Sequence, residues 1–246
     1  MAIGVHPARV PVVARSFDQP VAVIGDIHGA IRHLEALLRQ LPADIPILFS
    51  GDLCDRGPDT RAVLDLLLSR RATGVRGNHD EWFDDWASGR GFDRFALSMA
   101  MGGEFTLASY GVEGRTAHAI ESQRERVPLA HRQFIESLPV AMDLDVMGEQ
   151  YWLVHAGVPL TESLRGVSRH DVVHHLARTH RAALLWPHTS PEDVLPLDRT
   201  IVMGHMPQRR PVDLGHVIAL DTGCSTTRPN QLSAVILPER RFVTVG

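Results

Sequence analysis

This sequence of 246 residues contains no lysine, and the 25 residues counted as lysine or arginine are all arginine. No lysine can therefore serve as a catalytic amine. Cysteine is almost as rare, since Cys54 and Cys224 are the only two and stand far apart in the chain. Two distant thiols do not make a disulfide framework, so we expect a protein of the reducing cytoplasm.

Long apolar runs and a surplus of one charge are also missing. No stretch approaches the roughly 18 apolar residues that a membrane span needs, and residues 1–20 lack the apolar core of a signal peptide. The net charge is −4, with acidic and basic residues spread along the chain. This pattern predicts neither nucleic acid nor a membrane surface as a partner, and it leaves the oligomeric state open.

The chain does have an ordinary globular composition, with 44% hydrophobic and 22% charged residues. A chain of this length predicts a single domain, 1–246. Short apolar runs alternate with segments in which apolar residues recur every three or four positions. This alternation favours an α/β fold.

The rest of the chain is organised around a strand that ends in polar side chains. Val21 to Ile24 is an apolar, mostly β-branched run that predicts a buried strand, and a helical apolar pattern begins at Ile31. Between them, Asp26 and His28 stand at alternate positions. Residues two apart in extended backbone point to the same side, so this carboxylate and imidazole aim at one point. Such strand ends are where α/β sheets usually hold their chemistry.

The same arrangement recurs at four further predicted strand ends, at 45–50, 72–76, 151–154 and 200–203. Each is followed by side chains that bind metals or form hydrogen bonds: Asp52, Asn78 with His79, His155, and His205. Residues 81–139 predict a helical insertion over these strand ends. Three more strands are predicted near the C-terminus, at 217–220, 232–237 and 242–245.

The side chains at the five strand ends form a set of nitrogen and oxygen donors without a pair of thiolates. Such a set suits manganese, iron, zinc or cobalt. Three of the histidines, two aspartates and one asparagine are too many ligands for one tetrahedral ion. They suit two ions roughly 3.5–4 Å apart, with Asp52 in the middle of the set as the bridge.

These motifs resemble those of the calcineurin-like metallophosphoesterases, and within them the bacterial phosphoprotein-phosphatase-type enzymes related to diadenosine tetraphosphatases. The matching runs are Gly-Asp-Ile-His-Gly at 25–29, Gly-Asp-Leu-Cys-Asp-Arg-Gly at 51–57, Gly-Asn-His-Asp at 77–80, His-Ala-Gly at 155–157 and Gly-His at 204–205. They stand in the family's order over most of the chain. The resemblance implies a four-layer α/β/β/α sandwich of two mixed sheets with a helical insertion.

The resemblance also implies a role for each residue of the set. Two divalent ions, with manganese expected first, are bound by Asp26, His28, Asp52, Asn78, His155 and His205. Asp52 bridges the ions, and Asp26 and His28 belong to the first. The residues that act on the phosphoester are Arg56 and Asn78 as substrate contacts, His79 as general acid, and Asp55, which orients His79.

One departure from the family's pattern concerns the second arginine that contacts phosphate. The corresponding segment here is Leu185-Trp186-Pro187-His188, so His188 stands where that arginine would be. An imidazole at this place is neutral at high pH, whereas arginine stays charged. We therefore expect His188 to contact the substrate more weakly than an arginine would.

The implied activity is metal-dependent hydrolysis of a phosphoester. We expect phosphorylated serine or threonine in a protein as the substrate, with small phosphoesters also accepted. The alternative is symmetrical hydrolysis of a dinucleoside polyphosphate such as diadenosine tetraphosphate. A third hypothesis, a binding module without catalysis, predicts lost ligands, yet every expected ligand is present together with His79 and Arg56.

Overall fold

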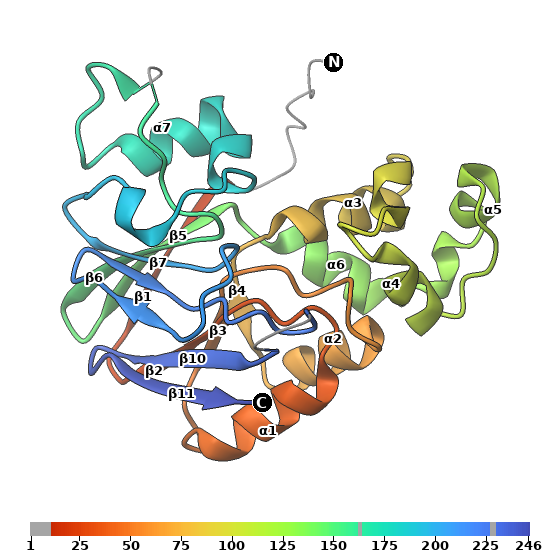
Figure 1. The fold of residues 1–246 in the computed structure, drawn as a ribbon, viewed down its shortest axis with the longest axis horizontal. Helices are drawn as coiled ribbons and strands as arrows, with labels where there is room; N and C mark the ends of the chain where they lie inside the picture. The colour runs from red at the N-terminus through yellow and green to blue at the C-terminus, as the bar shows by residue number, and fades with distance from the viewer. Residues whose placement is uncertain (1–10, 162–163, 227–229) are drawn as a thin grey trace.

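The computed structural model describes residues 11–161, 164–226 and 230–246, whose strands form two mixed sheets (Figure 1). In the five-stranded sheet the order is β11 (Arg241–Val245), β10 (Leu232–Leu237), β2 (Val21–Ile24), β3 (Ile47–Phe49) and β4 (Thr73–Gly74). Strands β2, β3 and β4 run parallel, and β10 is antiparallel to β2. The carboxyl ends of β2, β3 and β4 therefore lie on the same edge.

The six-stranded sheet repeats this arrangement with different strands. Its order is β1 (Val12–Phe17), β5 (Ala141–Val146), β6 (Glu149–Val154), β7 (Thr200–Met203), β9 (Val217–Ala219) and β8 (Val212–Asp213). Strands β6, β7 and β9 are parallel, whereas β5 and β6 form an antiparallel hairpin. Each sheet thus contributes three parallel strands whose carboxyl ends point the same way.

Alternate residues of the central strands face different layers of the core. In β2, Val21 and Val23 pack between the sheets, where they join Leu153 and Val202 of the opposite sheet. Ala22 and Ile24 instead face helices α1 (Ile31–Gln40) and α2 (Thr60–Ser69). Both faces of the strand are buried, which explains its uninterrupted apolar sequence.

The outer face of the six-stranded sheet is covered by α7 (Val172–Thr179), whose Val173 and Leu176 pack against Trp152 and Ile201. Figure 1 shows α7 above the two sheets, α1 below them and α2 beside them. The predicted four-layer α/β/β/α sandwich is therefore confirmed. Short 3₁₀ turns, Arg181–Leu184 and Pro191–Asp193, lie in the segment between α7 and β7.

The segment between β4 and β5 is helical and extends to one side of the sandwich in Figure 1. It contains α3 (Asn78–Ala87), α4 (Gly103–Ser109), α5 (Ala117–Glu121), α6 (Leu129–Ser137) and 3₁₀ turns at Arg94–Leu97 and Arg124–Arg126. The fully buried Arg76 ties it to β4, because its guanidinium donates to Asp84 Oδ2 at 2.5 Å and to the Ile135 carbonyl at 2.9 Å. No helix among the described residues has the length and apolar character to cross a membrane.

Two strands and one helix start differ from the sequence prediction. Strands β1 and β8 were not predicted, and both lie at sheet edges, where exposed residues such as Arg15 interrupt the apolar pattern. Helix α3 begins at Asn78, three residues before the predicted start of the helical segment. It begins there because the Asp80 carboxylate accepts from the Gly77 backbone N–H, which caps the first turn.

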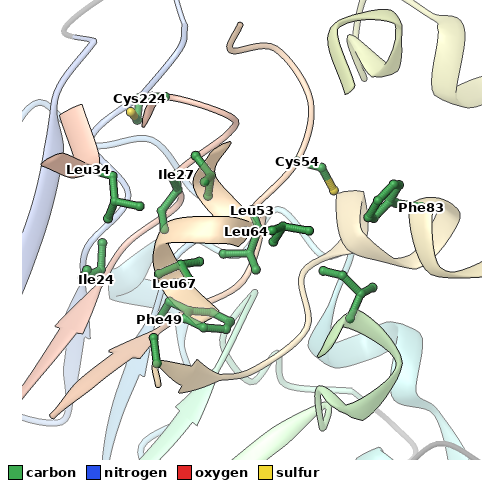
Figure 2. Close-up of a cluster of buried hydrophobic side chains, with 14 of the residues drawn as sticks. Ile24, Ile27, Leu34, Phe49, Leu53, Cys54, Leu64, Leu67, Phe83 and Cys224 are labelled. Carbon is green, nitrogen blue, oxygen red and sulfur yellow. The ribbon is translucent and has the colours of Figure 1, made fainter. Parts of the chain in front are cut away.

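The two cysteines lie in the helix-facing core of the five-stranded sheet (Figure 2). Burial raises the pKa of Cys54 well above the usual thiol range and the pKa of Cys224 to about 12. Because the thiolate is the reactive form, we predict that neither thiol reacts with Ellman's reagent in the native protein. Both should react after denaturation in guanidinium chloride. Rapid labelling of either thiol before denaturation contradicts this prediction.

Candidate dimetal centre

The carboxyl ends of the parallel strands of both sheets meet at one place. The side chains that follow them are Asp26 after β2, Asp52 after β3, Asn78 after β4, His155 after β6, His205 after β7 and Asp221 after β9. Hydrogen bonds join the two sheets here, because His155 Nδ1 lies 2.8 Å from the Ser50 carbonyl. All six side chains except the half-buried His205 are at most 4% exposed.

Two groups of potential ligands in the described part of the chain share one carboxylate. His28, Asp52 and His79 form the first group, and Asp52, His155 and His205 form the second. Within each group the ligating atoms all lie within 4.8 Å of one another. Asp52 thus lies where a bridging ligand belongs. The first group includes His79, to which the sequence prediction gave a role as general acid, and not the expected ligand Asp26.

Two of the imidazoles are oriented by backbone carbonyls. His28 Nδ1 lies 2.8 Å from the Cys54 carbonyl, and His155 Nδ1 lies at the same distance from the Ser50 carbonyl. Each Nδ1–H donates to its carbonyl, which turns Nε2 toward Asp52, at 3.5 Å for His28 and 3.4 Å for His155. This is the arrangement that holds metal-binding histidines in other proteins.

The two central carboxylates are held by backbone N–H groups that follow glycines. Asp52 accepts from the N–H of His79 at 3.0 Å, and Asp26 accepts from the N–H of His205 at 3.0 Å. A Cβ atom at Gly77 would overlap the Asp52 carboxylate, and one at Gly204 would overlap that of Asp26. The glycine in each motif is therefore required by the close approach of backbone and carboxylate.

Asp80 organises the turn that carries Asp52, a role that the sequence analysis missed. It is fully buried and accepts from the backbone N–H groups of Asp52, Leu53 and Gly77, each at 2.9 Å. Asp52 has the left-handed φ of +52°, which these bonds help to hold. The position of Asp80, three residues after the helix-capping Gly77, is the one sequence signal for this role.

His79 is the end of a buried hydrogen-bonded chain. Its Nδ1 lies 2.7 Å from Asp55 Oδ2, which also accepts from the indole N–H of Trp82 at 2.8 Å. The other carboxylate oxygen of Asp55 accepts from Thr106 Oγ1 at 2.8 Å. No spacing rule marks Thr106, because 51 residues separate it from Asp55. These hydrogen bonds fix the imidazole with Nε2 turned away from Asp55.

Arg56 lies between the first ligand group and His79. Its guanidinium donates to His28 Nε2 at 2.7 Å and to His79 Nε2 at 3.0 Å. The same NH2 group donates to the Ala100 carbonyl at 3.2 Å. Arg56 adopts a left-handed φ of +61°, and its backbone N–H donates to the Gly102 carbonyl. The helical segment therefore sets the position of this cation.

The charges of the cluster are strongly coupled. Burial and the nearby Asp221 raise the pKa of Asp26 well above its usual range. Burial alone would raise the pKa of Asp52, but His155 and His79 outweigh it and hold that pKa well below its usual range. Burial likewise opposes protonation of His155, yet Asp52 and Asp26 raise its pKa to about 10. Buried carboxylates therefore retain a proton on this imidazole, where a divalent cation would replace it.

The second ligand group contains a buried donor or acceptor that metal coordination would satisfy. His205 Nε2 is buried and finds no hydrogen-bond partner among the described residues. Burial and the charge on His155 lower the pKa of His205 to about 3, so this imidazole is neutral. Neutral imidazole is the form that binds metals. The residues present therefore fit a metal at this position.

Two residues lie at the rim of the centre. The exposed His188 has its ring 5.3 Å from that of His205, so the structure places it beside the second ligand group. Asp221 accepts from the Gly223 N–H at 2.8 Å and is 3% exposed. Its charge acts on Asp26, and its own pKa rises to about 6, first because of burial.

Two packed mixed sheets with paired histidine and aspartate clusters at their joint edge define a metallophosphoesterase. The chain belongs to the calcineurin-like phosphoesterase family, whose model matches residues 19–242. The family uses two metal ions, and the chain is a phosphoesterase-type hydrolase. Its resemblance to the family, first inferred from the sequence motifs, is thus confirmed.

Relatives with different activities are similar to almost the whole chain. An asymmetrical bis(5'-nucleosyl)-tetraphosphatase, PrpE of Oceanobacillus iheyensis, is 28% identical over 92% of this chain and 92% of its own length. Serine/threonine-protein phosphatase 1 of Salmonella typhimurium is 28% identical over 82% of this chain and 86% of its own length. A metallophosphoesterase structure from Sphaerobacter thermophilus has a TM-score of 0.54 at 18% identity, covering 93% of this chain and 89% of its own.

The close approach at Gly204 predicts a specific defect. Gly204→Ala should displace the Asp26 carboxylate and weaken Mn²⁺ binding by about 10- to 100-fold, the range seen when support of metal ligands is removed. Isothermal titration calorimetry of the metal-free protein measures this. Gly215→Ala is the control, because its Cβ meets open space in the turn before β9, although its φ of +85° costs some stability. Equal Mn²⁺ affinity in the two variants would contradict the prediction.

Proposed function

We propose that the chain hydrolyses phosphate-containing substrates at a centre in which Asp52 bridges two divalent ions. The shared position of Asp52 in both ligand groups carries this proposal. His28 and Asp26 would hold the first ion, while Asn78, His155 and His205 would hold the second. The donor set suits manganese, with iron, zinc and cobalt as alternatives. Two such ions, when bound, supply a hydroxide nucleophile at neutral pH and offset phosphoryl charge.

Arg56 is the residue best placed to bind the phosphoryl group. Its guanidinium contacts both His28 and His79, so it spans the space between the first ligand group and the proposed general acid. Guanidinium forms paired hydrogen bonds with phosphoryl oxygens and stays charged at all relevant pH values. Asn78 and His188 would add contacts from the side of His205.

His79 would donate the proton that the leaving oxygen needs. Its Nδ1–H is held by Asp55, so Nε2 is the nitrogen that would carry the transferable proton once the substrate phosphate, in place of this imidazole, accepts from Arg56. Asp55 stabilises the imidazolium and fixes its orientation, as a buried carboxylate does for other catalytic histidines. Thr106 and Trp82 are positioning residues in this scheme, because they hold Asp55 and touch no substrate.

We infer that the preferred substrate is a dinucleoside tetraphosphate that is cleaved asymmetrically. Similarity to the asymmetrical tetraphosphatase over 92% of both chains supports this substrate class. Hydrolysis then adds one water across a phosphoanhydride and yields a nucleoside triphosphate and a nucleoside monophosphate. The sequence had favoured phosphoprotein, with symmetrical dinucleotide cleavage as its alternative. Similarity to the Salmonella protein phosphatase keeps phosphoserine and phosphothreonine as the second candidate substrates.

The deciding experiment compares initial rates of the Mn²⁺-loaded protein on diadenosine tetraphosphate and on a phosphoserine peptide. We expect faster turnover of the dinucleotide, with ATP and AMP as products by chromatography. Two molecules of ADP would indicate symmetrical cleavage, and a faster rate on the peptide would favour the protein phosphatase. Asp52→Asn should abolish turnover of every substrate. No turnover by the metal-loaded wild type would support the binding module.

The role of His79 predicts a dependence on the leaving group. His79→Asn should slow hydrolysis of phenyl phosphate by about 10²–10⁴-fold, the usual contribution of a general acid. It should slow p-nitrophenyl phosphate much less, because p-nitrophenolate leaves without a proton. Thr106→Val should show the same selectivity with a smaller loss, through Asp55. Ser109→Ala, on the same helix, is the control. Equal losses of rate on the two substrates would contradict the role of His79 as general acid.

A further inference from the structure

A second hollow lies directly beside the dimetal centre and has no role in the mechanism above. It has a volume of about 340 Å³ and is bounded by the first turn of α1, the turn after Arg56 and the residues Ser225, Thr226 and Asn230. Residues that line it include Arg32, His33, Arg56, Gly57, Ser225 and Asn230. Its size is that of a small ligand-binding pocket.

The chemistry of its walls selects for an anion. Arg32 and Arg56 carry permanent positive charges, and His33 adds a further nitrogen donor. Ser225, Thr226 and Asn230 offer neutral polar groups, and no acidic side chain is among the described residues that line the hollow. Arginine is the side chain best suited to phosphate oxygens. A phosphate-rich ligand fits these walls better than a neutral or cationic one.

Arg56 belongs to both the hollow and the dimetal centre. Its guanidinium contacts His28 and His79 on the metal side, while the same residue lines the hollow. A substrate with one phosphate at the metal centre would therefore continue past Arg56 into the hollow. A phosphomonoester is too short to do this, because it has no second phosphate.

The walls between the two sites are fixed by hydrogen bonds. Ser225 Oγ donates to the His28 carbonyl at 2.9 Å, and its backbone N–H donates to Asn230 Oδ1 at 2.9 Å. Gly57 packs so closely on the His28 carbonyl that a Cβ atom there would overlap it. Ser225 and Asn230, which form part of one wall, are thus attached to the metal-binding motif, and this pre-organises the hollow for its ligand.

We propose that this hollow is the subsite for the phosphates beyond the scissile bond, with Arg32 and His33 as specificity-determining residues. This inference rests on the proposed function, since it names how the same centre would recognise a polyphosphate chain. It also gives a physical reason for asymmetric cleavage. A subsite on one side of the attacked phosphorus holds a run of phosphates, so the bond cleaved is set by how many of them the subsite accepts.

The test compares Arg32→Ala with Arg39→Ala, because both arginines are exposed on α1 and Arg39, in the last turn, does not line the hollow. Inhibition of p-nitrophenyl phosphate hydrolysis by inorganic tripolyphosphate and by orthophosphate is measured at constant free Mn²⁺. We expect Arg32→Ala to weaken tripolyphosphate inhibition about tenfold, as the loss of one charge-assisted bond would. Orthophosphate inhibition should change no more than in Arg39→Ala.

Turnover provides the second measurement. Arg32→Ala should lower kcat/KM for diadenosine tetraphosphate about tenfold and affect p-nitrophenyl phosphate no more than Arg39→Ala does. His33→Ala should show the same selectivity with a smaller loss. Equal losses on both substrates, or tripolyphosphate inhibition unchanged in Arg32→Ala, would overturn the subsite.

The measurements can overturn the proposed substrate without overturning the phosphate subsite, and the reverse. If the wild type hydrolyses p-nitrophenyl phosphate but not the dinucleotide, the proposed substrate is wrong, and the tripolyphosphate measurement still decides the subsite. If the wild type hydrolyses neither compound, tripolyphosphate binding is measured directly by calorimetry on the Mn²⁺-loaded protein. Weaker binding in Arg32→Ala than in Arg39→Ala then supports the subsite, and equal binding overturns it.

Discussion

The structure depends on the burial of several carboxylates and imidazoles at one point, which is unfavourable unless each finds a partner. Asp26 and Asp52 are each 2% exposed, and both are held by backbone N–H groups from the other motifs. Each of those N–H groups belongs to a histidine of the cluster, His205 for Asp26 and His79 for Asp52. Two motifs thus each stabilise a carboxylate of another motif, and the bond from His205 to Asp26 requires both sheets to be in place.

Several backbone positions in this arrangement are strained, and the surrounding contacts keep them in their strained conformations. Five of the site residues adopt left-handed φ values between +47° and +74°: His28, Asp52, Asp55, Arg56 and His205. Such conformations cost about 1–3 kcal/mol each and persist where the environment fixes them. Here hydrogen bonds to Asp80, the Gly102 carbonyl and Thr106 fix three of them, Asp52, Arg56 and Asp55. The helical segment after β4 therefore serves the centre as a set of supports for Asp55 and Arg56.

The same architecture would allow one kind of centre to act on substrates of different length. The metals and Arg56 would recognise a single phosphoryl group, which phosphoproteins, small esters and dinucleotides all contain. The hollow beyond Arg56, which is lined by arginine and histidine, would then decide among them. Relatives in this family carry both activities, which agrees with a common centre and differing surroundings.

Much of the fold and the centre was predictable because the information is local. The apolar run before Asp26 marks a strand buried on both faces, and the same pattern recurs before Asp52, His155 and His205. Parallel strands align their carboxyl ends, so the side chains that follow neighbouring strands of one sheet were expected to lie close together. The edge strands β1 and β8 were missed for the converse reason, since half-exposed strands carry weak apolar patterns.

The sequence by itself determined the α/β class and the donor set of the centre, because strand periodicity and residue chemistry are local properties. The four layers followed from the resemblance of its motifs to those of the family. Only the tertiary structure decided the rest. It placed Thr106 against Asp55 across 51 residues, Ser225 on the His28 carbonyl across 197, and Arg32 in a hollow shared with Arg56. Contacts between residues so far apart in the chain follow from how the elements pack, and no periodicity records them.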